Sequence, residues 1–227
     1  QLYWFKEWDT VFTWDPKTIK ATWFNGGKTN VSYNCLDVNL KKIADKIALI
    51  WQGEPEDDII KITYKELYNE VCKFANVLKK KGVKKGDRVC IYMPMIPELA
   101  IAMLACTRIG AIHNIVFGGF SATSLKDRIL DSQCKLLITA DGGFRNGKII
   151  PLKSIADDAI SQCDCIESVI VAKRTKQEIK MEKKRDTYWG DEMKSVSNIC
   201  EPEHMDAEDP LFILYTSGTT AKPKGVL

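Results

Sequence analysis

Short apolar segments alternate with amphipathic segments along most of the chain, and this alternation limits the possible folds more than any other feature. Apolar residues recur at helical spacing from Leu67 to Leu78. A T-x-x-E capping box formed by Thr63 and Glu66 precedes them, and Gly82 follows as a helix-ending residue. Further helices are expected at 98–109, 123–131 and 152–163, and strands at 88–93, 112–117, 135–140, 168–172 and 211–215. This order predicts an α/β fold with a mainly parallel sheet flanked by helices.

The first 57 residues have a different character from the rest of the chain. Four of the six tryptophans lie in the first 23 residues, the periodicity is weak, and turn signals occur at Asp15-Pro16 and Asn25-Gly26-Gly27. We expect residues 1–57 to form an aromatic-rich leader segment that packs its aromatic side chains onto a neighbouring domain. The regular alternation then occupies residues 58–227.

Composition excludes several classes of protein and site. The net charge of +3 is too small to indicate a nucleic-acid or membrane partner, and no apolar run is long enough to span a membrane. Eight cysteines without a C-x-x-C pair and only two histidines give no zinc site. We therefore expect reduced cysteines, no metal ligands and a cytoplasmic location. His113 is expected in the interior, and the charged segment 172–186 as a solvated excursion.

Three loops that follow strand candidates are rich in glycine or hydroxyl side chains. They are FGGFS at 117–121, ADGGFRNGK at 140–148 and TSGTTAKPKG at 216–225. In a parallel sheet, ligands bind beyond the carboxyl ends of the strands, so these loops are expected on one ligand-binding edge.

The loop at 216–225 has the donors that a polyphosphate requires: several hydroxyls, glycines that expose backbone N–H groups, and two lysines. It is not a Walker A loop, because Pro223 stands where that pattern requires glycine. By composition alone, a solvated linker rich in Ser, Thr, Gly and Lys remains an equal alternative.

Longer motifs resemble a known family. YTSGTTAKPKGV at 215–226 resembles the phosphate-binding signature of the adenylate-forming superfamily, and residues 82–121 resemble its amino-terminal subdomain. WFNGGKTNVSYNCLD at 23–37 and ITADGGFRNGKIIPLK at 138–153 narrow the resemblance to the AMP-forming acetyl-CoA synthetases. The resemblance covers the chain from about residue 4 to its end. It implies an acetyl-CoA-synthetase-type segment at 1–57 and the first, incomplete part of an AMP-binding domain at 58–227.

The resemblance implies a two-step ligase whose substrates are acetate, ATP with Mg²⁺, and CoA, without a prosthetic group. The phosphates of ATP would be bound by Thr216, Ser217, Gly218, Thr219, Thr220 and Lys222. Ala221 stands where such families usually carry glycine, which restricts the backbone of this loop.

A second set of residues is implied for CoA. Its anionic nucleotide end would be bound by Gly119, Arg145, Asn146, Gly147 and Lys148. Lys148 stands where the family commonly has arginine, so the positive charge is kept while the planar, two-pronged guanidinium group is lost. On the residues alone, two surface cations in a turn are the favoured interpretation of Arg145 and Lys148, and the resemblance reverses that preference.

Whole members of the family are more than twice as long. The acyl pocket and the catalytic lysine would lie outside this chain, so we expect a truncated fold that has no catalytic residue and is inactive by itself. A propionyl- or other short-chain acyl-CoA synthetase, and a non-catalytic module that binds CoA or a nucleotide, remain alternatives. The sequence gives no indication of the oligomeric state.

Overall fold

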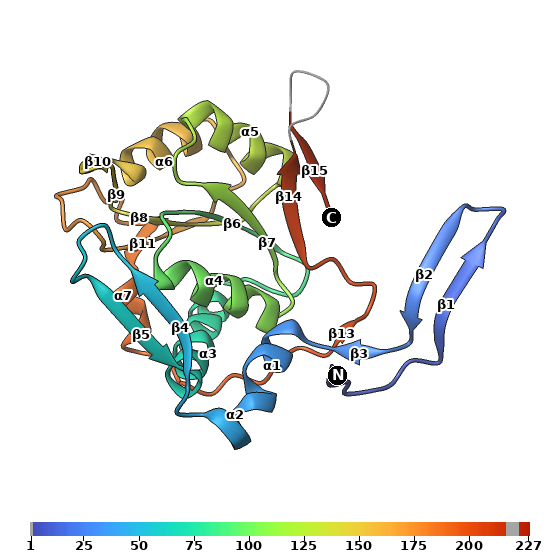
Figure 1. Cartoon of the computed structure of the whole chain (residues 1–227). Coiled ribbons are helices and arrows are strands. Elements are labelled where there is room, and N and C mark those ends of the chain that lie inside the picture. The colour runs from blue at the N-terminus through green and yellow to red at the C-terminus, as the bar shows by residue number, and fades with distance from the viewer. Residues whose placement is uncertain (1, 217–222) are drawn as a thin grey trace.

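The computed structural model describes residues 2–216 and 223–227, and its centre is a twisted seven-stranded sheet (Figure 1). All neighbouring strands are parallel except the last pair, which is antiparallel. The strand order is β12 (Asp186–Tyr188), β11 (Ser168–Ala172), β8 (Leu136–Ala140), β6 (Arg88–Met93), β7 (Ile112–Phe117), β14 (Phe212–Thr216) and β15 (Lys224–Val226). The predicted α/β class is therefore confirmed, and the five expected strands lie within one residue of their predicted positions.

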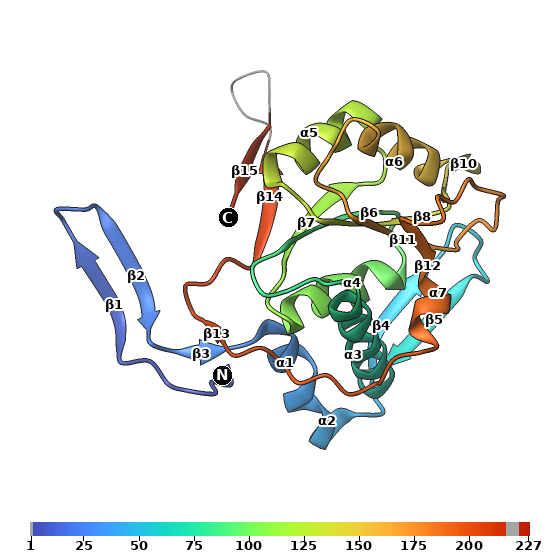
Figure 2. The same ribbon diagram turned by 180° about the vertical axis from the view of Figure 1, so that it is seen from behind.

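Helices cover both faces of the sheet (Figures 1 and 2). One face carries α3 (Tyr64–Lys80), α4 (Pro97–Arg108) and α7 (Trp189–Met193), and the other carries α5 (Ala122–Ser132) and α6 (Leu152–Ile160). Both hydrogen bonds of the predicted capping box at α3 are present, from Glu66 N to Thr63 Oγ1 and from Thr63 N to Glu66 Oε2. Within the described ranges, no helix combines the length and the hydropathy that a membrane span needs.

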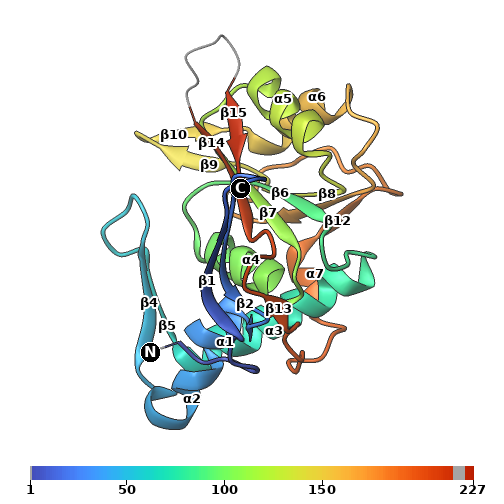
Figure 3. The same cartoon turned by 90° about the vertical axis from the view of Figure 1, so that its right-hand side faces the viewer.

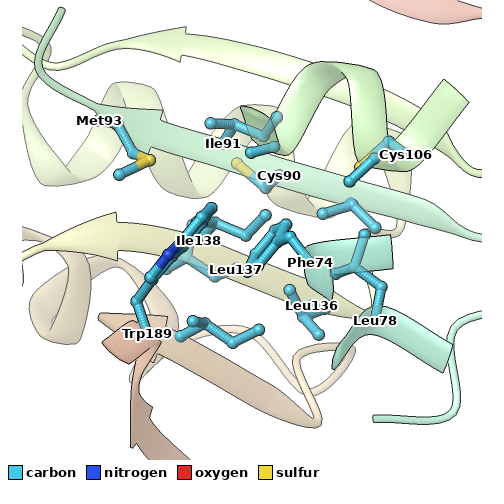
Figure 4. Packing of buried hydrophobic residues seen from close by; sticks show 14 of the residues in the cluster. Phe74, Leu78, Cys90, Ile91, Met93, Cys106, Leu136, Leu137, Ile138 and Trp189 are labelled. Carbon is cyan, nitrogen blue, oxygen red and sulfur yellow. The ribbon is translucent and has the colours of Figure 1, made fainter. Parts of the chain in front are cut away.

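The hydrophobic core lies between the sheet and its helices (Figure 4). Strands β6, β8 and β11 are buried on both faces, which explains why their sequences are continuous apolar runs rather than alternating ones. The rings of Phe74 and Trp189 stack with centroids 3.6 Å apart and join α3 to α7. All eight cysteines lie in described parts of the chain as free thiols, and six of them are buried, as expected for structural cysteines.

The first 63 residues contain two antiparallel hairpins that the sequence analysis did not predict. Their strands are β1 (Thr10–Asp15) with β2 (Lys20–Asn25), and β4 (Ile47–Gln52) with β5 (Ile59–Thr63). Between them lie β3 (Lys28–Thr29), α1 (Val31–Cys35) and α2 (Asp37–Ile43), and β3 pairs with β13 (Met205–Asp206). The proposed domain boundary at residue 57 falls in the turn of the second hairpin.

The β1–β2 hairpin projects from the body of the molecule in Figures 1 and 2. The rings of Phe12, Trp14 and Trp23 on it are about half exposed. Phe5 stacks on His204 at 3.8 Å, whereas Trp4 and its aromatic neighbours pack on one another. The expected packing of leader aromatics onto another part of the protein therefore holds for Phe5, and also for Trp51, which packs against the hydrophobic core.

The prediction that residues 172–186 form a solvated excursion is wrong at both ends of that segment. Ala172 ends the buried strand β11, and Asp186 begins β12 with 6% of its surface exposed. The carboxylate of Asp186 binds the buried ammonium group of Lys153 at 2.9 Å and the guanidinium group of Arg185 at 2.6 Å. Between these two ends most of the charged side chains are exposed, as predicted, and the ion pair formed within the segment is that of Arg185 with Asp186.

His113 is buried in β7, as predicted, but it is not fully satisfied by hydrogen bonds. Its Nδ1 atom has no hydrogen-bond partner in the described structure, and the ring of Phe212 lies 5.6 Å from its own. Burial in this apolar setting lowers the pKa of His113 to about 4.

We expect the free energy of unfolding to fall below pH 6.5, because the unfolded chain binds a proton on His113 that the folded chain excludes. The stabilisation is complete above pH 6.5 and is lost progressively toward pH 4, with a loss of about 2 kcal/mol at pH 5. Urea denaturation at several pH values measures the effect. His113→Gln should flatten the dependence of the free energy of unfolding on pH, whereas His204→Gln, at an exposed position, should leave this dependence unchanged. Equal slopes in both variants would contradict the assignment of the effect to His113.

Candidate ligand-binding site

The loops that follow four parallel strands converge on one cavity of about 360 Å³ at the carboxyl edge of the sheet. Its wall is formed by the loops after β6 and β7, by the segment after β8 and by Arg174 after β11. The turn of the β4–β5 hairpin completes it. The rule that ligands bind beyond the carboxyl ends of parallel strands predicts that the loops 117–121 and 140–148 share one edge of the sheet, and the structure brings them together at this cavity. The lining residues are Trp51–Glu54, Met93–Ile96, Phe117–Gly119, Gly143–Arg145, Ile150, Leu152 and Arg174.

Arg145 lies at the end of a small hairpin made of β9 (Gly143–Arg145) and β10 (Lys148–Ile150). Asn146 and Gly147 form its two-residue turn with φ angles of 51° and 70°, the left-handed pair that an Asn-Gly hairpin turn adopts. The guanidinium group of Arg145 lies over the ring of Phe117, 5.5 Å from its centroid. The hairpin therefore presents two exposed cations, Arg145 and Lys148, beside the cavity.

Gly119 lies directly against Arg145. A Cβ atom added at Gly119 would lie 2.5 Å from Cε1 of Phe117 and 2.7 Å from Nη1 of Arg145. The absence of a side chain therefore lets the guanidinium group approach the backbone of the 117–121 loop. The structure brings Gly119, Arg145, Asn146, Gly147 and Lys148 to the same corner of the sheet edge.

A carboxylate from the β4–β5 hairpin binds the turn beside Arg145. Glu54 accepts hydrogen bonds from Asn146 N at 2.6 Å and from Gly147 N at 3.0 Å, one at each carboxylate oxygen. The turns of the two hairpins lie close together on one side of the molecule (Figure 3). These two hydrogen bonds join residues that lie 92 and 93 positions apart in the sequence at the mouth of the cavity.

Arg174 forms the opposite wall of the cavity. Its guanidinium group lies over the rings of Trp51 and Phe144, at 4.7 and 5.0 Å, and binds Asp58 at 2.6 Å. The indole N–H of Trp51 donates to the carbonyl oxygen of Met95 at 2.5 Å. This wall therefore combines flat aromatic surfaces with a cation whose charge is already balanced by Asp58.

Buried polar groups fix the loops around the cavity. The carboxylate of Asp141, 1% exposed, accepts from the backbone N–H groups of Gly142, Arg174, Thr175 and Lys176, and so joins the segments after β8 and β11. The hydroxyl of Tyr92 donates to the carbonyl oxygen of Phe120 at 2.7 Å, and burial raises the pKa of Tyr92 to about 12. Tyr92 therefore remains a hydrogen-bond donor to the 117–121 loop at any physiological pH.

Glu98 lies in the first turn of α4, and burial raises the pKa of its carboxyl group. The helix N-terminus and the charge of Arg174 oppose that shift, but the loss of water around the carboxyl group outweighs them. The charged form of Glu98 is therefore disfavoured relative to that of an exposed glutamate.

The phosphate-loop residues predicted from the sequence are only partly described. Thr216 ends β14 and pairs with Lys224 of β15, and it is not part of the cavity wall described above. Strand β14 lies beside β7, so the loop starts at the same sheet edge as the 117–121 loop. Ser217, Gly218, Thr219, Thr220, Ala221 and Lys222 lie outside the described residues.

Trp51, Glu54 and Arg174 were missed by the sequence analysis. Arg174 comes two residues after the end of β11, so the same positional rule would have selected it. The surrounding charges concealed it, because a charge run usually indicates a solvated face. No local signal identifies Trp51 or Glu54, since their position depends on a hairpin that joins distant segments.

An α/β domain with a mainly parallel sheet and a cavity at the carboxyl edge of that sheet belongs to the class whose ligands bind beyond the carboxyl ends of the strands. The family model of AMP-binding enzymes matches residues 36–227, and the model of the acetyl-coenzyme A synthetase N-terminus matches residues 1–35. The chain belongs to the family of AMP-binding enzymes.

The chain is similar over its whole length to several acetyl-coenzyme A synthetases. It is 59% identical to that of Gamma-proteobacterium EBAC31A08 over 226 residues, and 57% identical to that of Saccharophagus degradans over 226 residues. It is 54% identical to acetyl-coenzyme A synthetase 2 of Pseudomonas aeruginosa over 226 residues. Each alignment covers 100% of this chain and 35% of the relative, so the chain spans about a third of the length of these relatives.

Proposed function

We propose that the complete protein to which this chain belongs is an ATP-dependent acetate–CoA ligase. The observation that carries this proposal is the similarity to acetyl-coenzyme A synthetases along the entire chain. The cavity supports it, because a nucleotide end with phosphates needs both flat apolar contacts and cations, and both occur there.

The reaction proceeds in two steps. A carboxylate oxygen of acetate attacks the α-phosphorus of ATP, the bond to the bridging oxygen breaks, and pyrophosphate leaves. The thiol sulfur of CoA then attacks the acetyl carbon, its proton is lost, and the bond to AMP breaks. Activation is necessary because oxide is a poor leaving group from a carboxylate, whereas AMP leaves readily.

This chain would supply the phosphate contacts of the first step. The loop 216–222 would bind the β- and γ-phosphates of ATP, which arrives with Mg²⁺ as part of the substrate. Its hydroxyls, backbone N–H groups and Lys222 would stabilise the charge that passes to pyrophosphate. Ala221 is compatible with this role but restricts the backbone there.

For the second step, Arg145 and Lys148 would bind the phosphates at the nucleotide end of CoA, with the backbone at Gly119 in close approach. Both side chains are exposed at the mouth of the cavity and have no carboxylate within ion-pair distance among the described residues. Their charges are therefore available to an anionic ligand. We further propose a cytoplasmic location on the basis of the eight free cysteines, and no nucleic-acid or membrane partner on the basis of the weak net charge.

Pyrophosphate release measured on the complete protein with acetate, propionate or butyrate tests the proposed reaction. We expect acetate to give the highest kcat/KM. A preference for propionate or butyrate would indicate another short-chain acyl-CoA synthetase. Absence of release with every acid would favour a non-catalytic module that binds CoA or a nucleotide. The 227-residue chain alone is expected to release none.

Gly119→Ala should weaken CoA binding by about tenfold, because the new methyl group forces Phe117 and Arg145 apart and overpacking of this kind costs 1–3 kcal/mol. The KM for CoA measures the effect, and the rate of adenylate formation should not change. Gly190→Ala is a suitable control, since a Cβ there meets nothing within 4 Å. A KM for CoA that is unaffected by Gly119→Ala would argue against the close approach of the nucleotide.

A further inference from the structure

The two backbone N–H groups of the Asn146-Gly147 turn point outward from the hairpin, where an anion could bind them. Consecutive N–H groups in the left-handed conformation form a concave donor site, and a ligand phosphate would be a natural occupant. The structure fills this site internally, because each oxygen of the Glu54 carboxylate accepts one of the two N–H groups. A ligand phosphate would have to displace a two-point, charge-assisted contact in order to bind there.

The turn that carries Glu54 is itself held in place. Gly53 N donates to the carbonyl oxygen of Asp58 at 2.7 Å, and the side-chain amide of Gln52 donates to the carbonyl oxygens of Pro55 and Glu56. The far end of the turn is fixed by the ion pair between Asp58 and Arg174 at 2.6 Å. Glu54 is therefore presented by a closed turn that is attached to the opposite wall of the cavity.

Glu54 does not neutralise the cations beside it. Among the described residues, no ion pair within 4.0 Å joins Glu54 to Arg145 or to Lys148. Its carboxylate is used on the backbone of the turn, and the two cationic side chains on either side of that turn remain available. The arrangement separates two roles: Glu54 orders the backbone, and Arg145 with Lys148 provides the charge.

We propose that Glu54 is a positioning residue that clamps the Asn146-Gly147 turn and thereby holds Arg145 and Lys148 at the mouth of the cavity for an anionic ligand. This inference rests on the proposed function of the cavity as the site for the phosphates of CoA. The family resemblance implies that Asn146 and Gly147 themselves bind CoA. In this proposal their N–H groups are bound to Glu54, and the ligand contacts come from the flanking side chains.

The experiment compares Glu54→Gln, Glu54→Asp and the matched control Glu56→Gln. Glu56 lies in the same turn, and Glu56→Gln removes the same charge. The carboxylate of Glu56 forms no hydrogen bond to the described residues of the β9–β10 hairpin. In the complete protein, Glu54→Gln should raise the KM for CoA about five- to tenfold, because one of two charge-assisted hydrogen bonds is lost and the other weakened. The rate of pyrophosphate release with acetate and ATP should stay unchanged, Glu54→Asp should restore part of the loss, and Glu56→Gln should behave like the parent.

A measurement without ligand separates this inference from the proposed function. In the NMR spectrum of the 227-residue chain, the amide protons of Asn146 and Gly147 should shift upfield in Glu54→Gln but not in Glu56→Gln. Coincident amide resonances in parent and Glu54→Gln, or an unchanged or lower KM for CoA in Glu54→Gln, overturn the clamp. A lower KM would mean that the carboxylate competes with the ligand. If Arg145→Ala leaves CoA dependence unchanged, the proposed function of the cavity fails, and the amide comparison alone decides whether Glu54 clamps the turn.

Discussion

Replacement of Arg145 by alanine is expected to raise the KM for CoA about 10- to 100-fold in the complete protein, while the rate of pyrophosphate release from ATP and acetate stays unchanged. A hydrogen bond to a charged group contributes about 1.5–3 kcal/mol, and each 1.4 kcal/mol is a factor of ten in affinity. Because Arg145 is supported by Phe117 and by the clamped turn, its guanidinium group is ordered before the ligand arrives.

Two further variants make the Arg145 measurement specific. Arg145→Lys keeps the charge but loses the planar fork, so its effect should fall between those of the parent and Arg145→Ala. Lys183→Ala removes an equal charge from an exposed site that forms no ion pair in the described structure, and it should leave the KM for CoA unchanged. Equal effects of Lys183→Ala and Arg145→Ala would indicate general electrostatic attraction, and an unchanged KM in Arg145→Ala would remove Arg145 from the CoA site.

The central sheet and its helices were predictable because each element carries a local signal. The capping box at Thr63 and the continuous apolar runs of β6 and β8 depend only on neighbouring residues. The β4–β5 and β9–β10 hairpins were not predicted. Both are short, largely exposed ribbons whose sequences show no clean alternation. The β9–β10 hairpin nevertheless carries a local signal, because the Asn146-Gly147 dipeptide is typical of a two-residue hairpin turn.

The candidate site divides in the same way. Gly119 and Arg145 follow predicted strands, so the parallel-sheet rule predicts that they lie at one edge of the sheet. Glu54 meets their neighbours only because two hairpins far apart in sequence fold toward each other. Arg174 lay within reach of the same rule, but the charge run around it indicated solvent. Contacts between distant segments are what the sequence alone could not supply.

Arg108 is the strongest example of such a contact in the part of the chain that the structure describes. From the sequence it is an ordinary cation in the last turn of α4, yet it is 1% exposed. Its Nη1 and Nη2 atoms bind the two carboxylate oxygens of Asp37 at 2.8 and 2.9 Å, and Nε donates to the carbonyl oxygen of Cys200 at 2.6 Å. Arg108 therefore joins α4 to the leader segment and to the strand-free segment before β13.

Burial opposes the charge on Arg108, but the hydrogen bonds that Arg108 donates to Asp37 outweigh it and raise the pKa of Arg108 above its usual value. Arg108 is consequently charged in the folded state. Removing either residue leaves the charge of the other poorly solvated. The stability lost in this way is larger than the stability that the ion pair contributes relative to apolar residues in its place.

Arg108→Ala should lower the free energy of unfolding by about 3–5 kcal/mol, because it leaves Asp37 without its partner and the carbonyl oxygen of Cys200 without its donor. Urea denaturation of the 227-residue chain measures this loss. Lys194→Ala breaks an exposed pair with Asp191 and should change stability by less than about 0.5 kcal/mol. Arg108→Met combined with Asp37→Leu should recover much of the loss, because the uncompensated charge is gone. A double variant as unstable as Arg108→Ala would show that packing around Arg108, rather than the unpaired charge, accounts for the effect.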